Sequence, residues 1–356
     1  MHLTDNVVTV SAIVPVKNGS RWLPECLDSL LNQQLPNAVR LQVSIYDDAS
    51  TDDTMQIAQS YRSKFIAKKI DCKICSGSIS RGVGFAKNRA VRQSDGRFLC
   101  FCDADDINCP SRVRIQLAGA MRCCDPMMAF VGSRFRRLPG ESTKRFTKWA
   151  NSLSDSQLCT QIFTSHGPTL VAPTWFISRY LFDLVGGFHE EHPVGYPEDL
   201  RFFYEAFKIG ARFIRVDEYA VTYRYHMGCA SFAVPESTIW DMRIAAFEQF
   251  VLPKWNSFTI WNAGKQGKRF YRSLNKNSRS KVVAFCDVDR KKIARGSYEH
   301  FDHASRTVTA VIPIIPVEKA SPPVAICMKL DLTDGVFEAL IGERGWNEGV
   351  DFYYLS

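Results

Sequence analysis

The chain contains 356 residues, of which 46% are hydrophobic and 23% are charged, and it carries a formal net charge of +8. Its length allows two or three domains with a sizeable core. No stretch approaches the roughly 20 apolar residues that a membrane helix needs, and the polar N-terminal residues do not fit a secretory signal. Together with twelve scattered cysteines, which we interpret as reduced thiols, this predicts a cytoplasmic protein.

Strand-like and helix-like patterns alternate along the N-terminal part of the chain. Apolar, β-branched runs predict strands at residues 7–16, 39–48, 68–77 and 96–106. Apolar spacing with three- and four-residue steps predicts helices at residues 22–33, 51–61, 84–94 and 109–117. This alternation indicates an α/β fold with a mostly parallel sheet and helices on both faces. Ligands of such sheets bind beyond the carboxyl ends of the strands.

Three carboxylates follow the fourth predicted strand in the segment "DADD" of residues 103–106. Without a partner, they would repel one another and raise each other's pKa. A bound Mn²⁺ or Mg²⁺ ion removes that cost, because carboxylate oxygens are ligands that hard cations prefer. The alternative is an Asp-rich helix N-terminus, since a helix is predicted directly afterwards. The residues alone leave both interpretations open.

Six segments in order resemble the GT-A fold glycosyltransferases of family 2, over roughly residues 8–250. They are "VSAIVPVKNG", "YDDAS", "RGVGFAKNRAV", "GRFLCFCDADD", "GGFHEEHPVGYPEDL" and "YRYHMGCAS". The resemblance implies a nucleotide-sugar-binding domain whose metal stabilises the diphosphate leaving group. It also implies a carboxylate base that deprotonates the acceptor hydroxyl, with inversion at the anomeric carbon.

The resemblance assigns roles to individual residues of this chain. It implies that Asp199 of "PEDL" is the catalytic base, and that the metal is bound by Asp105 and Asp103, with His226 as a further candidate ligand. We expect Asp106 to cap the following helix, and Glu198 to contact the acceptor or to cap its own helix. The remaining expected substrate-binding residues are Pro15, Val16, Asn18, Asp48 (with Asp47 as the alternative), Lys87, Arg89, Ala104, Trp175, Gly187 and Phe188.

Two of these roles have a simpler alternative. A single histidine such as His226 is often structural. The rings of Trp175 and Phe188 are expected to offer stacking faces to the acceptor, but aromatic residues at this density are also ordinary core.

The C-terminal part begins the pattern again, so we divide the chain into a GT-A domain at 1–254 and a small α/β, Rossmann-like domain at 255–356. "FTIW" and "KVVAFCDVD" predict strands around a Gly-turn and helix in "NAGKQGKRFYRSL", and two more strands are expected within 309–330. The turn resembles a dinucleotide fingerprint in which Asn262 replaces the first glycine, so we favour a domain that binds no cofactor. Its basic residues suit an RNA backbone.

Positive charge also gathers between residues 133 and 149. This segment, "SRFRRLPGESTKRFTKW", carries Arg134, Arg136, Arg137, Lys144, Arg145 and Lys148. Such patches attract polyanions such as nucleic acid, although a solvated surface is the simpler interpretation.

With the C-terminal part included, the chain resembles an animal group of queuosine-tRNA galactosyltransferases, also named β-1,3-N-acetylglucosaminyltransferase-like proteins. This resemblance implies galactose transfer from UDP-galactose to the queuosine of tRNA-Tyr at the anticodon wobble position. The alternatives are a β-1,3-N-acetylglucosaminyltransferase acting on a glycan, a nucleotide-sugar-binding protein without turnover, and an NAD(P)-dependent enzyme built on the C-terminal part. No residue by itself distinguishes a galactose from an N-acetylglucosamine donor.

Overall fold

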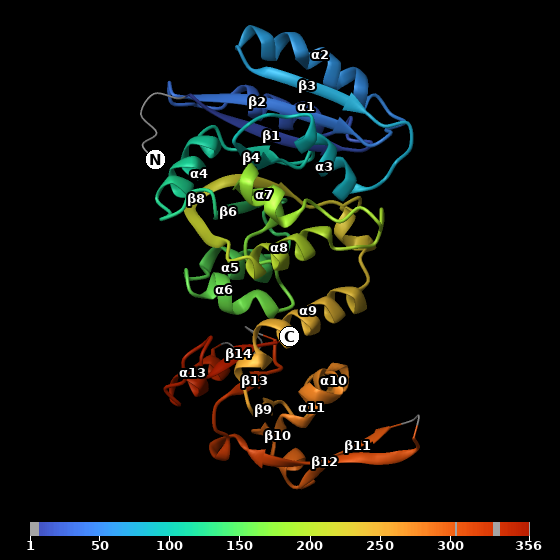
Figure 1. Cartoon of the computed structure of the whole chain (residues 1–356), viewed down its shortest axis with the longest axis vertical. Helices are drawn as coiled ribbons and strands as arrows, with labels where there is room; N and C mark the ends of the chain where they lie inside the picture. The colour runs from blue at the N-terminus through green and yellow to red at the C-terminus, as the bar shows by residue number, and fades with distance from the viewer. Residues whose placement is uncertain (1–6, 303–304, 330–334, 356) are drawn as a thin grey trace. The chain divides into compact units, whose positions relative to one another are not determined.

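The computed structural model describes residues 7–302, 305–329 and 335–355, and the chain forms two compact units (Figure 1). The first extends to Leu158 and resumes at Pro168–Pro235, and the second comprises Cys159–Gly167 and the chain from Glu236 onward. The domain boundary predicted from the sequence lies after residue 254, whereas the structure groups helix α9 (Glu236–Phe250) with the second unit. The reason is packing: Phe247 of α9 makes edge-to-face contacts with Phe163 and Phe270, both in the second unit.

An eight-stranded sheet forms the centre of the first unit, in the order β3-β2-β1-β4-β7-β6-β8-β5. The strands are β1 (Val8–Val16), β2 (Val39–Asp47), β3 (Asp71–Ser76), β4 (Phe98–Phe101), β5 (Ile107–Asn108), β6 (Ala129–Leu138), β7 (Phe176–Ser178) and β8 (Arg212–Arg224). The four strands from β3 to β4 pair in parallel, and β7 joins β4 in the antiparallel sense. The predicted α/β fold and its four N-terminal strands are confirmed.

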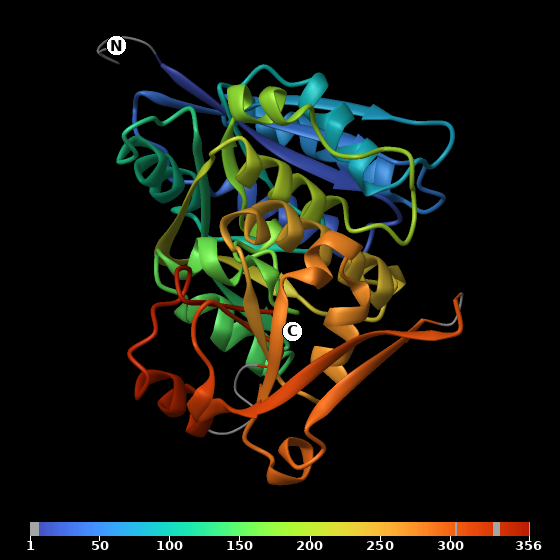
Figure 2. The same cartoon turned by 60° about the horizontal axis from the view of Figure 1, so that its bottom comes forward.

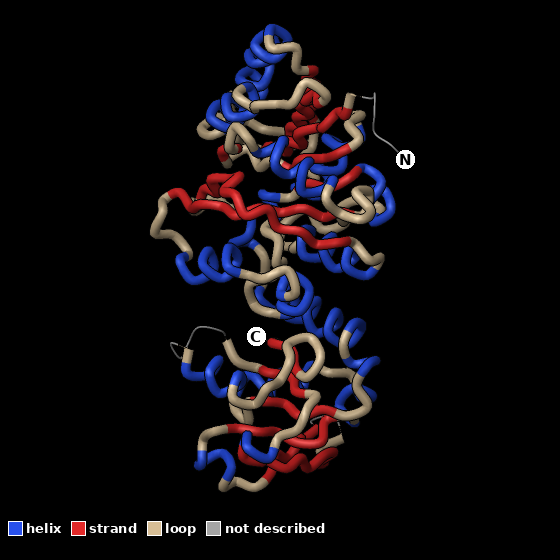
Figure 3. Tube along the Cα trace, turned by 90° about the vertical axis from the view of Figure 1, so that its left-hand side faces the viewer, coloured by secondary structure: helices blue, strands red, loops and turns tan. Residues whose placement is uncertain are grey.

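Helices separate most of these strands along the chain. They are α1 (Leu23–Leu31), α2 (Thr54–Ala67), α3 (Val83–Arg92), α4 (Arg112–Met121), α5 (Lys144–Ser152), α6 (Gln157–Thr160), α7 (Arg179–Val185) and α8 (Glu198–Lys208). The first four confirm the helices predicted from apolar spacing. Figure 3 shows helices on either side of the strands within each unit.

Parallel pairing explains where the functional residues meet. Strands β1, β2 and β4 run in the same direction, and Val16 at the end of β1 is in register with Asp47 at the end of β2. The loops that follow these strands therefore lie at the same edge of the sheet. The predicted nucleotide loop, Asp48 and the "DADD" segment all occupy this edge.

The second unit has a six-stranded sheet in the order β11-β12-β10-β9-β13-β14. Its elements are β9 (Phe258–Trp261), α10 (Lys265–Ser273), α11 (Lys276–Ser280), β10 (Val282–Asp287), α12 (Arg290–Ile293), β11 (Ser297–Asp302), β12 (Thr307–Pro316), β13 (Val324–Ile326), α13 (Val336–Gly342) and β14 (Phe352–Tyr354). All its strand pairs are parallel except β11–β12, which extends from the sheet as a hairpin (Figure 2). The strands predicted around the Gly-turn are confirmed as β9 and β10.

In the part of the chain that the structure describes, no helix combines the length and the apolar character required to cross a bilayer.

Candidate active site

The acidic cluster of Asp103, Asp105 and Asp106 lies directly after β4, and carboxylate oxygens of the three residues lie within 4.8 Å of one another. Asp106 is 1% exposed, and its Oδ1 accepts a hydrogen bond of 2.7 Å from the backbone N–H of Arg224. Its Oδ2 is buried and has no hydrogen-bond partner among the described residues. The prediction that Asp106 caps the following helix was wrong, because Ser111 stands at the N-cap of α4 and Asp106 is turned toward β8.

Burial and neighbouring negative charge disturb the titration of Asp103 and Asp106. Burial is the largest cause that raises the pKa of Asp103 to about 6, and Asp105 adds to it while Lys87 opposes it. The pKa of Asp106 is raised well above its ordinary value, again by burial first and then by Asp105 and Asp103. The carboxylates therefore lack sufficient positive charge from the protein itself, which is the condition that a bound divalent cation relieves.

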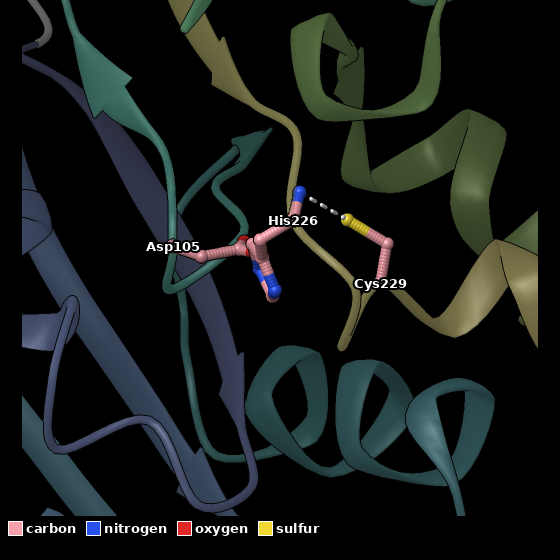
Figure 4. Close-up of side chains that lie close together, drawn as sticks. All are labelled: Asp105, His226 and Cys229. Carbon is pink, nitrogen blue, oxygen red and sulfur yellow. Dashed lines mark hydrogen bonds and ion pairs between the residues drawn. The ribbon is translucent and has the colours of Figure 1, made fainter. Parts of the chain in front are cut away.

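His226, in the segment that follows β8, lies next to Asp105 of the acidic cluster (Figure 4). Its Nε2 lies 2.8 Å from Asp105 Oδ2, while its Nδ1 accepts a hydrogen bond from the backbone N–H of Gly228 at 3.1 Å. Because a backbone N–H can only donate, Nδ1 carries no proton, and Nε2 donates to the carboxylate. Cys229 contributes a third metal-ligating atom within 4.8 Å, although its Sγ accepts from the backbone N–H of His226.

A buried ion pair joins α3 to the start of α8. Lys87, 5% exposed, donates from Nζ to Glu198 Oε1 at 2.9 Å. Burial alone lowers the pKa of Lys87, but Glu198, Asp103 and Asp199 together raise it above its ordinary value. The predicted residues Lys87, Glu198, Asp199 and Asp103 are thus near enough to act on one another, although they come from three separate elements.

Asp199 is half-buried at the first turn of α8, and its Oδ1 accepts from the backbone N–H of Leu200 at 2.7 Å. Burial, followed by the charge of Glu198, raises its pKa to about 6, against the influence of Lys87. A carboxylate with this pKa is mostly ionised at neutral pH and is a stronger proton acceptor than an ordinary aspartate.

The loop after β1 lies against the acidic cluster. Pro15 and Val16 are buried at the end of the strand, and a Cβ on Gly19 would come within 2.6 Å of Val16 Cγ2 and 3.9 Å of Ala104 Cβ. Asn18 has a φ of 49° and accepts from the backbone N–H of Thr51 at 2.8 Å. The loops after β1 and β2 are therefore hydrogen-bonded to each other, and the predicted residues of the nucleotide loop lie together at this edge of the sheet.

Asp48 has a set of partners that sequence analysis did not foresee. It is 2% exposed, and its carboxylate accepts from Ser80 Oγ at 2.7 Å and from the backbone N–H groups of Arg81 and Gly82 at 2.9 and 2.8 Å. The carboxylate anchors the loop before α3. Its expected contact with a uracil stays a prediction.

The aromatic residues expected at the acceptor side lie in the core. Trp175 is 1% exposed and contacts Phe130 edge-to-face at 4.9 Å, while Phe188 is 4% exposed and stacks on Phe202 at 4.6 Å. Neither ring offers a free face in this structure, so the expected stacking on an acceptor does not fit their burial. Arg89 is half-buried and lies over Phe85, with its Cζ 4.5 Å from the ring centroid.

Comparisons with known proteins agree with this arrangement. Residues 11–185 match the family model described as glycosyl transferase family 2. The family 2 segment contains β1, β2, β4 and the acidic cluster, and it ends before Asp199 and His226.

Relatives of the family 2 segment include the poly(ribitol-phosphate) beta-N-acetylglucosaminyltransferase TarS of Staphylococcus aureus, 38% identical over 96 residues. The match covers 27% of this chain and 16% of TarS. The chondroitin synthase of Escherichia coli is 35% identical over 116 residues, which cover 31% of this chain and 15% of that protein. The chain therefore spans only about a sixth of the length of these curated relatives.

The fold is similar to that of S. aureus TarS in complex with UDP-GlcNAc. The TM-score is 0.53 with 20% sequence identity, over 75% of this chain and 70% of that chain. The GT-A fold is therefore established for this protein.

Two further residues hold the site of the first unit together and were not predicted. Asn88 of α3 donates from Nδ2 to Phe188 O and accepts from Phe188 N, both at 2.8 Å, so it positions the loop that contains Gly187. The guanidinium of Arg224 donates to Asp105 O at 2.9 Å and to Glu25 at 2.8 Å. Both residues stand inside motifs that were recognised, next to Lys87 and near His226, but their partners are distant in sequence.

Proposed function

We propose that this protein is a metal-dependent, inverting glycosyltransferase that moves galactose from UDP-galactose to the queuosine of tRNA-Tyr. The observation that carries the transferase proposal is the meeting of an unneutralised acidic cluster with the Lys87–Glu198 pair and Asp199, at the carboxyl edge of a GT-A sheet. The acceptor and the sugar rest on the resemblance described above.

The residues of the acidic cluster fit a divalent cation. Asp106 Oδ2 is buried without a hydrogen-bond partner among the described atoms, and Asp103 and Asp105 bring further oxygens within 4.8 Å. Asp103 and Asp105 would hold Mn²⁺ or Mg²⁺, with His226 as a nitrogen ligand through Nε2 once its ring proton moves to Nδ1. A cation bound there neutralises charge on the departing diphosphate.

Asp199 is proposed as the general base. It begins α8 beside Glu198, so the Lys87–Glu198 ion pair fixes the turn that presents its carboxylate. Its raised pKa, about 6, increases its affinity for the acceptor proton while leaving it ionised at pH 7. The buried Lys87 ammonium stays charged and opposes the build-up of negative charge around Asp103 and Asp199.

The number and clustering of basic residues support a polyanionic acceptor. The chain has 45 Lys and Arg residues against 37 Asp and Glu residues, and the basic groups gather in residues 133–149 and again between residues 265 and 295. Clustered basic side chains suit a phosphodiester backbone.

A second candidate is N-acetylglucosaminyl transfer to a glycan. It is favoured by the names of the relatives, since TarS is a beta-N-acetylglucosaminyltransferase and its structure is described in complex with UDP-GlcNAc.

The test is a competition. The purified protein would be incubated with Mn²⁺, an equimolar mixture of UDP-galactose and UDP-GlcNAc, and tRNA containing queuosine, and the digested nucleosides would be weighed by mass spectrometry. We expect a hexose added to queuosine and none with the Asp199→Asn variant. Addition of an N-acetylhexosamine would contradict UDP-galactose as the donor. No added mass, with UDP binding intact, would contradict the acceptor and favour the second candidate.

A further inference from the structure

Arg137, near the end of β6, is a guanidinium surrounded by aromatic rings. Its Cζ lies 3.8 Å from the ring centroid of Tyr223, 5.5 Å from those of Phe135 and Phe146, and 5.7 Å from that of Tyr225. It makes no hydrogen bond or ion pair with any residue that the structure describes, and its Nε and Nη1 atoms are buried without an acceptor. These rings hold the plane of the group in place and leave its donors unused.

Two buried arginines of the same unit show the contrast. Arg112, 1% exposed, donates to Phe101 O at 2.7 Å and to Gln116 Oε1 at 3.0 Å. Arg224, 8% exposed, is paired with Glu25 at 2.8 Å. Buried donors are almost always satisfied in native structures. The unused donors of Arg137 therefore point to a partner from outside the chain.

Arg137 lies beside the acidic cluster, with one strand between them. It is in register with Tyr223 of β8, and the backbone N–H of Tyr225 donates to Leu138 O at 2.9 Å. On the other side of β8, the backbone N–H of Arg224 donates to Asp106.

Further cations extend this region on β6 and α5. Arg136, Lys144 and Lys148 are all exposed. Lys144 pairs with Glu141, and the Arg136 Cζ lies 4.8 Å from the Tyr219 ring centroid. Several exposed cations close in sequence to a partly buried arginine suit a ligand with several phosphates better than one small anion.

We propose that Arg137 binds a phosphate of the acceptor's backbone, and that Arg136, Lys144 and Lys148 contact neighbouring phosphates of the same strand. A guanidinium can hold two oxygens of one phosphate at once, so this contact orients the acceptor as well as attracting it. The identity of the acceptor as RNA rests on the proposed function. A phosphate could also come from the donor diphosphate, but the acidic cluster that would hold the donor's metal lies across β8 from Arg137.

The test compares Arg137→Gln and Arg137→Lys with Arg40→Gln. Arg40 is an exposed arginine near the amino end of β2, away from the carboxyl edge, and serves as the matched control. Dissociation constants would be measured for queuosine-containing tRNA over a range of salt concentrations, and for UDP by calorimetry. We expect Arg137→Gln to weaken tRNA binding about tenfold and to lower the salt slope by about one, with UDP binding unchanged. Arg137→Lys should keep the salt slope and recover part of the affinity, because it retains the charge without the planar fork.

Two results would overturn the proposal. Unchanged tRNA affinity and salt slope in Arg137→Gln, with wild-type transfer to tRNA intact, would remove Arg137 from the acceptor site. A parallel loss of UDP affinity would assign the arginine to the donor diphosphate instead. Thermal melting of each variant separates both results from misfolding, and Arg137→Lys remains informative if the Gln variant unfolds. A wild-type protein that adds no sugar to tRNA would contradict the proposed function, which is a distinct outcome.

Discussion

The two units each have a mostly parallel sheet in which aspartates lie at or just after the end of one strand, but these aspartates differ in whether their oxygens have hydrogen-bond partners. After β4, the carboxylates of Asp103, Asp105 and Asp106 crowd together, and one buried oxygen has no partner among the described residues. After β10, Asp287 accepts from Ala263 N and Lys292 Nζ, both at 2.9 Å, and from Asp289 N at 3.0 Å.

The polar groups of the Gly-turn in the second unit also find a hydrogen-bond partner within the turn itself. The backbone N–H of Gly264 donates to Asn262 Oδ1 at 2.8 Å, and a Cβ on Gly267 would come within 1.9 Å of Asn262 O. Gly267 therefore allows α10 to pack closely against the loop that precedes it. A motif at a strand end is therefore a candidate site only where the fold leaves its polar groups without hydrogen-bond partners.

The largest expected effect comes from the proposed base. Asp199→Asn should lower kcat about a thousandfold, because a general base contributes between two and four orders of magnitude. UDP binding should be retained. Steady-state kinetics and calorimetry measure the two quantities, and Glu205→Gln on the same helix is the control. A variant with more than a tenth of wild-type kcat would exclude Asp199 as the base.

A smaller effect is expected at His226. His226→Ala should weaken Mn²⁺ binding about 10- to 100-fold, whether the imidazole binds the ion or only orients Asp105, from which it lies 2.8 Å away. Titration followed by electron paramagnetic resonance measures the affinity. Asp287→Asn, at the satisfied strand end of the second unit, should leave it unchanged. Equal losses in both variants would remove the distinction between the two strand ends.

Asp287 should matter for stability instead. Asp287→Ala leaves two backbone N–H groups and a lysine without their acceptor, and we expect a loss of roughly 2 kcal/mol in the free energy of opening of the second unit. Native-state hydrogen exchange of the amides in β9 and β10 measures this quantity. Asp105→Asn should leave the protection of these amides intact. Unchanged exchange in Asp287→Ala would show that the turn does not depend on this carboxylate.

The smallest expected effect is the stabilisation of the folded protein by bound metal, which should depend on pH. The pKa of Asp103 is about 6 in the folded protein and about 4 in an unfolded chain, so the folded state binds more protons across this interval. Without metal, the free energy of unfolding therefore falls as the pH rises from about 4 to about 6. Because a cation binds the ionised carboxylates, Mn²⁺ should raise the melting temperature by about 3 °C at pH 7.5 and by less at pH 5. A larger gain at pH 5 would contradict a metal site at Asp103.

Much of the local structure follows from the sequence. Strands β1 to β4 and helices α1 to α4 were predicted from the spacing of apolar residues, because a period of two or of 3.6 residues is a local property of the chain. The order of the motifs also predicted that Asp48 and the "DADD" segment would share one edge of the sheet, which parallel pairing of β1, β2 and β4 confirms.

The partners of individual side chains could not be predicted in this way. Asp106 was expected to cap a helix and instead accepts from Arg224, and Asp48 is occupied by the loop before α3. Trp175 and Phe188 were expected at the acceptor side and lie in the core. In each case a hydrogen bond or a packing contact with a distant segment decided the outcome, and no local pattern encodes such a contact.

The sequence by itself determined the succession of strands and helices in the first unit and the acidic character of the sheet edge at which its motifs meet. Only the tertiary structure decided which charges are paired. Lys87 meets Glu198 across 111 positions, and Arg224 meets Glu25 across 199, whereas Arg137 and one oxygen of Asp106 have no such partner among the described residues. The reason is physical: the free energy of a charge depends on its burial and on its nearest neighbours, and the fold brings those neighbours from distant parts of the chain.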